Sequence, residues 1–64
     1  MRLTEFWSRM SEHFGPITAD SFARDHVITR LDGRTVNQAL EQGESAKTVW
    51  RAVCVDQDVP DSLR

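Results

Sequence analysis

The sequence contains one cysteine, two histidines and no apolar run of the length that a membrane helix or a signal peptide needs. A lone Cys54 excludes a disulfide within the chain, and the histidines lack the paired spacing of a structural zinc site. Glycine-rich phosphate loops, serine elbows and paired catalytic carboxylates are also missing. We therefore predict no catalytic residue, cofactor or metal site. The unpaired thiol and the missing export segment predict a cytoplasmic location.

The chain is also short and nearly neutral. Its 64 residues predict a single domain, 1–64, with a small core. Cores of this size supply only about 3–5 kcal/mol without a disulfide, a metal or self-association. The net charge of −2 creates no overall attraction to nucleic acid or to an anionic membrane. The acidic excess lies in residues 35–64, which carry three basic and five acidic side chains.

A first helix is predicted over residues 4–14. Five apolar side chains there recur at the offsets of one helical face: Leu3, Phe6, Trp7, Met10 and Phe14. Thr4 can cap its start, and Gly15 with Pro16 ends it.

A second helix is predicted over about residues 18–30, with Thr18 as its cap. Its apolar stripe consists of Ala19, Phe22, Ala23, Val27 and Leu31. Asp32 and Gly33 form a turn that stops it. Ile28 falls off the stripe, so we expect this side chain to be exposed unless another surface covers it.

Two shorter helices complete the pattern. Thr35 and Gln38 have the spacing of a capping box, which predicts a helix over 35–42 that ends at Gly43. Ser45 can cap a last helix over 45–57. Pro60 closes it, and we expect a frayed tail from about residue 60.

The sequence thus predicts an all-α fold, a compact bundle of four short helices with no strand. The expected core contains thirteen apolar side chains: Leu3, Phe6, Trp7, Met10, Phe14, Phe22, Val27, Leu31, Val36, Leu40, Val49, Trp50 and Val53.

The segment 35–57 has part of the pattern of a helix-turn-helix DNA reader. Ala39 is a small residue for the helix crossing, Gly43 can reverse the chain, and Val49 can seat the second helix. Apolar residues usually flank the turn glycine in that motif, whereas here Gln42 and Glu44 do. A plain helical hairpin with a glycine cap is the commoner structure and is favoured.

Lys47, Thr48, Trp50 and Arg51 are the candidate contacts for DNA or for a protein partner. Phosphate binding usually recruits more than two cations, which weakens the DNA interpretation. Trp50 is more simply a core residue, although a tryptophan beside an arginine is also common at protein interfaces. The exposure of Trp50 discriminates between these alternatives, because a buried indole cannot face DNA.

Cys54 could act as a nucleophile with His13 or His26 as its base, but the sequence gives no reason for them to meet. A cysteine on an apolar helix face is usually a small buried hydrophobe. His26 is more often satisfied by a carbonyl or a carboxylate than by a metal.

The most distinctive stretches are LTEFW at residues 3–7, ARDHV at 23–27 and VWRAVC at 49–54. With the sequence around them, they resemble a family of small actinobacterial proteins, domain of unknown function 3046, over nearly the entire chain. The resemblance implies an intracellular bacterial helical protein and supplies no catalytic residue, cofactor or partner.

The leading hypothesis is a non-catalytic helical module that contacts another protein or a second copy of itself. The alternative is a weak DNA-associated protein that uses Lys47, Thr48 and Arg51 on the hairpin 35–57. An enzyme is a distant third hypothesis.

Overall fold

Four α-helices and two 3-10 turns follow one another along residues 1–64, all of which the computed structural model describes. The α-helices are α1 (Leu3–Phe14), α2 (Pro16–Asp25), α3 (Val36–Glu41) and α4 (Ala46–Asp56). The turns are η1 (Thr29–Leu31) and η2 (Asp61–Leu63). An all-α bundle without a β-strand is therefore confirmed.

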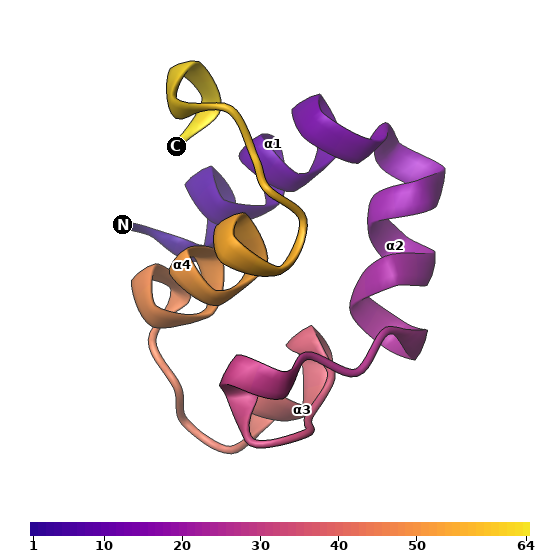
Figure 1. The fold of residues 1–64 in the computed structure, drawn as a ribbon, viewed down its shortest axis with the longest axis vertical. Helices are drawn as coiled ribbons and strands as arrows, with labels where there is room; N and C mark the ends of the chain where they lie inside the picture. Colours follow the sequence, from indigo (N-terminus) through magenta and orange to yellow (C-terminus); the bar gives the residue numbers. More distant parts are fainter.

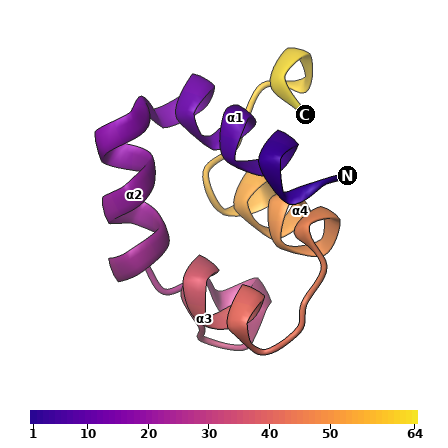
Figure 2. The same cartoon turned by 180° about the vertical axis from the view of Figure 1, so that it is seen from behind.

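The helices surround one core of 14 buried apolar residues, five of which lie on α4. α2 lies across the molecule from α4 (Figure 1). α1 packs against α2 and α4, while α3 packs against α2 and α4 from the other end. Both ends of the chain lie on the same side of the molecule, next to α4 (Figures 1 and 2). None of the helices is both long and apolar enough to cross a membrane.

Gly15 joins α1 directly to α2 with no loop between them. Its φ of 86° is accessible to glycine at little cost, and Pro16 has the fixed φ that suits the first residue of a helix. The caps predicted for these helices are wrong in both cases. α1 starts after Arg2 with no side-chain cap, and Thr18 lies inside α2.

The second helix ends at Asp25, five residues before its predicted end. His26 is extended, and the β-branched run that follows it disfavours helix. Side chains alternate in extended chain, so His26 and Ile28 lie on the opposite side from Val27. Val27 is 55% exposed, so the prediction that it lies in the core is wrong. Ile28 is fully buried, because the rest of the fold covers it.

A tight loop returns the chain from Ile28 to Arg34. The Ile28 amide donates to the Arg34 carbonyl at 3.0 Å, which closes the loop as an isolated antiparallel bridge. Inside it, η1 places Leu31 in the core, and Asp32 and Gly33 both have positive φ angles. The predicted turn at Asp32-Gly33 is confirmed, although it follows a 3-10 turn and not a long helix.

The hairpin of α3 and α4 follows the prediction closely. Thr35 and Gln38 form the capping box, and Ser45 caps α4 by accepting from the Thr48 amide at 3.1 Å. Gly43 reverses the chain at a φ of 95°. Ala39 and Val49, the expected crossing and seating residues, are fully buried.

The core contains most of the large side chains that the helical periodicity predicted. It also contains several small side chains that were not among the thirteen predicted core residues. Leu3, at 51% exposed, lies outside it, which corrects the prediction for this residue. At the C-terminal end, Asp61–Leu63 form η2, and Leu63 packs partly against the core. The buried residues are Phe6, Met10, Ala19, Ala23, Ile28, Leu31, Thr35, Val36, Ala39, Val49, Trp50, Ala52, Val53, Cys54 and Val59.

The inverted pair Val27 and Ile28 gives a direct test of the fold. We expect Ile28→Ala to lower the free energy of unfolding by about 2–4 kcal/mol, because it empties a fully buried site. The adjacent change Val27→Ala should cost less than about 0.5 kcal/mol, because that side chain is half exposed. Urea unfolding measures both values, and equal losses would contradict the extended chain at residues 26–28.

Candidate functional site

The outward face of α4 carries three of the four predicted contact residues. Lys47, Thr48 and Arg51 are exposed, whereas Trp50 is 3% exposed. Phe6 meets Trp50 edge to face, with ring centroids 6.1 Å apart, which fixes the indole in the core. Trp50 therefore cannot offer its ring to DNA bases, and its interpretation as a core residue is confirmed.

A groove lies beside this face and is the most enclosed of the five hollows on the surface. We call it the α4 groove; its volume is about 470 Å³. The lining comes from α1, α4 and the two ends of the chain: Met1, Arg9, Lys47, Trp50, Arg51, Cys54, Val55 and Arg64. Four of these eight residues are cations, and none is an acid.

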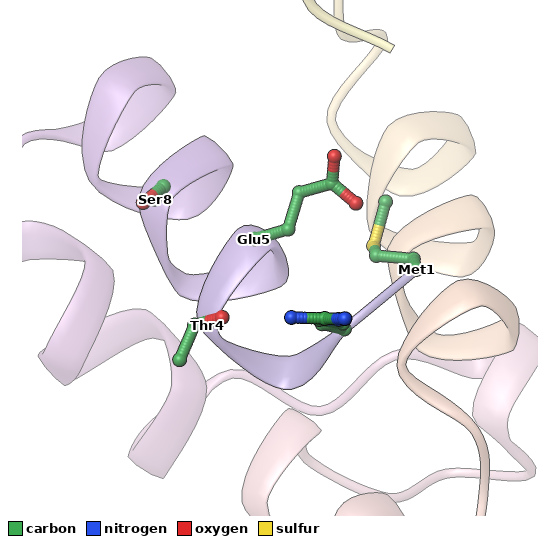
Figure 3. A pocket seen from close by; sticks show the side chains of 5 residues that line it. Met1, Thr4, Glu5 and Ser8 are labelled. Atoms are coloured by element: carbon green, nitrogen blue, oxygen red, sulfur yellow. The ribbon is translucent and has the colours of Figure 1, made fainter.

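Two other hollows each share lining residues with the groove. One shares Arg51 and Val55 with it and adds Arg30, Thr48 and Ala52. The other shares Met1 and is lined by polar residues at the start of α1. Figure 3 shows this N-terminal hollow, with the side chain of Met1 on the side nearest α4.

The groove and these two hollows are lined by most of the positively charged side chains of the protein. Six of its eight cations line them, and only one of its ten carboxylates, Glu5, does so. We call these six residues the basic strip: Arg2, Arg9, Arg30, Lys47, Arg51 and Arg64. A protein with a net charge of −2 thus carries a strongly basic face.

Four of the six cations of the strip have no side-chain partner. Arg2, Arg30, Lys47 and Arg51 form no ion pair and no side-chain hydrogen bond. Arg9 pairs with Glu5 at 3.4 Å and Arg64 with Asp61 at 3.7 Å, and exposed pairs of this kind contribute little to stability. Arg64 also donates from Nε to the Val59 carbonyl at 3.0 Å.

Of the other two cations, Arg34 is the more firmly engaged. Arg34 donates to the Glu44 carboxylate at 2.7 Å, to Gln42 Oε1 at 2.9 Å and to the Leu31 carbonyl at 2.7 Å. Gln42 and Glu44, which depart from the DNA-reader pattern, thus tie the hairpin turn to the loop that carries η1. Arg24 bonds Asp20 at 3.1 Å on α2.

The structure does not bring the candidate catalytic residues together. His26 lies 2.9 Å from Asp56 Oδ2 and stacks on Phe22, so its predicted pairing with a carboxylate is confirmed. His13 contacts Phe14 edge to face. No hydrogen bond joins either histidine to Cys54, and no group of three or more potential metal ligands occurs.

Cys54 is buried at the groove, as expected of a small hydrophobe. Burial raises the pKa of its thiol above the ordinary 9.0, while the positive charges of Arg64 and Arg9 act in the opposite direction. The nearby Nε1 donor of Trp50 is buried without a hydrogen-bond partner.

The sequence pattern missed four cations of the strip: Arg2, Arg9, Arg30 and Arg64. Arg2 precedes α1, Arg9 lies on it, Arg30 lies in η1 and Arg64 lies at the end of the chain. Only the tertiary packing brings Arg9, Arg30 and Arg64 beside α4. Helical periodicity within one element gives no information about such a convergence.

Comparison with known proteins gives a family and one informative relative. Residues 1–62 match the family model described as "Protein of unknown function (DUF3046)". The Mycobacterium tuberculosis protein named "Putative envelope-preserving system protein Rv2742c" is 44% identical over 39 residues, which are 61% of this chain. The match spans 14% of that protein. No solved structure matches the chain.

The raised pKa of Cys54 predicts a poorly reactive thiol. At pH about 8 we expect iodoacetamide to modify folded Cys54 at least about tenfold more slowly than the urea-unfolded chain, because burial disfavours the thiolate. The unfolded thiol ionises first, so the contribution of Cys54 to the free energy of unfolding should be level below pH 9.0 and fall as the pH rises above it. Equal rates in the folded and unfolded protein would contradict the burial.

Proposed function

Because the chain belongs to the DUF3046 family of proteins of unknown function, whose description assigns no activity, we propose a role from its surface. The role is that of a non-catalytic helical module that binds a partner protein through the α4 groove. The proposal rests on the basic strip. Its unpaired cations lie beside the apolar floor of the groove, and such a combination suits binding to another protein better than catalysis. The floor consists of Met1, Trp50, Cys54 and Val55. We retain the predicted cytoplasmic location as part of the proposal.

Charge favours a different protein over a second copy of this one. A symmetric dimer places the same surface on both sides of its interface. Two basic strips would then face each other, and like charges at an interface are costly. Self-association through the groove is therefore disfavoured and is not part of the proposal.

Weak DNA association remains the second candidate. It is supported by the exposed Lys47, Thr48 and Arg51 on α4 and by the other cations of the strip, which raise the number of possible phosphate contacts above two. It is disfavoured by the apolar floor, which contributes nothing to phosphate binding, and by the burial of Trp50.

Photo-crosslinking tests the proposal at a matched pair of positions. Val55 lies in the groove and is 49% exposed, whereas Val27 lies outside the three hollows and is 55% exposed. We expect a benzophenone side chain at position 55, in an actinobacterial host, to give a protease-sensitive adduct with another protein. The same side chain at position 27 should give none.

The chemistry of the adduct decides between the candidates. If nuclease removes the adduct at position 55 and protease does not, the ligand is a nucleic acid. The proposal of a partner protein would then be wrong, and the second candidate would take its place. A dimer of the chain itself, no adduct at position 55, or equal adducts at both positions would each contradict the proposal.

A further inference from the structure

All the unpaired cations of the molecule line the α4 groove or a hollow that shares residues with it. Arg2, Arg30, Lys47 and Arg51 have no carboxylate partner, and all four line these three hollows. The weak pairs of Arg9 and Arg64 can exchange their own carboxylates for those of a ligand. The strip therefore has the capacity to bind several negative charges at once.

The groove between these cations is not polar throughout. Met1 is 41% exposed and Val55 is 49% exposed, while Trp50 and Cys54 are buried beside them. A purely anionic ligand would leave Met1 and Val55 in water. A ligand that also carries an apolar side chain would cover them, and burial of apolar surface contributes roughly 25 cal/mol per Å².

We infer that the occupant of the α4 groove is an acidic amphipathic segment of a partner protein. Its apolar side chains lie on Met1 and Val55, and its carboxylates pair with the basic strip. This is the helix-in-groove mode of recognition, in which a partner helix presents an apolar face at i, i+3, i+4 and i+7. The inference rests on the proposed function and specifies the chemistry of the partner.

A synthetic peptide provides the test. The probe is a labelled peptide of about 15 residues, rich in glutamate, with leucines along one helical face. We expect fluorescence anisotropy to show binding by the full chain that weakens as salt is added, because the exposed charges are screened. A scrambled peptide of the same composition, without the leucine face, should bind at least about fivefold more weakly.

Two matched pairs of variants locate the binding surface. Arg51→Glu should weaken peptide binding about tenfold or more, whereas Arg24→Glu, which reverses an exposed cation on α2, should change it less than about twofold. Val55→Ser should weaken binding about threefold, and Val27→Ser should leave it unchanged. Circular dichroism checks that all four variants remain helical.

Three results would overturn the inference. They are equal binding of the ordered and scrambled peptides, equal effects of Arg51→Glu and Arg24→Glu, and tighter binding of duplex DNA than of the peptide at about 50 mM salt. A protein adduct at position 55 without peptide binding would reject the acidic segment and keep the proposed function. If neither the protein adduct nor peptide binding is observed, both the acidic segment and the proposed function are rejected.

Discussion

The edge-to-face contact between Trp50 and Phe6 fixes the rotation of α4 about its own axis. With the indole buried, Val49, Val53 and Cys54 also turn inward. Helical geometry then leaves Lys47, Thr48, Arg51 and Val55 on the outward face, because these positions lie within one arc of the helix. The same burial that stabilises a small core thereby exposes the surface that carries the proposed function.

The packing around α4 also explains why the total charge is a poor guide to the surface. The start of α1, η1 and the end of the chain all reach α4 and contribute cations to it. Most of the carboxylates lie elsewhere, where Arg24 and Arg34 pair with some of them. A net charge of −2 is thus the sum of a basic face and an acidic remainder.

Local chemistry made the hairpin of α3 and α4 predictable. Its capping box, its Ser45 cap and the turn at Gly43 depend on residues at most a few positions apart. Ile28 was not predictable in this way, because its burial depends on an early helix end and on the loop that closes at Arg34. The basic strip depends on packing between distant segments, so only its two residues on α4, Lys47 and Arg51, were predictable from the sequence.

A basic face on a net-acidic protein is the central claim, and nuclear magnetic resonance with two nitroxide probes of opposite charge tests it most directly. Local surface potential concentrates the probe of opposite sign. The amides of Lys47, Arg51 and Val55 should therefore relax faster with the anionic probe than with the cationic one, and those near Asp20 and Glu41 should show the reverse. If the ratio of the relaxation enhancements from the anionic and cationic probes were the same at every amide, the basic face would be contradicted.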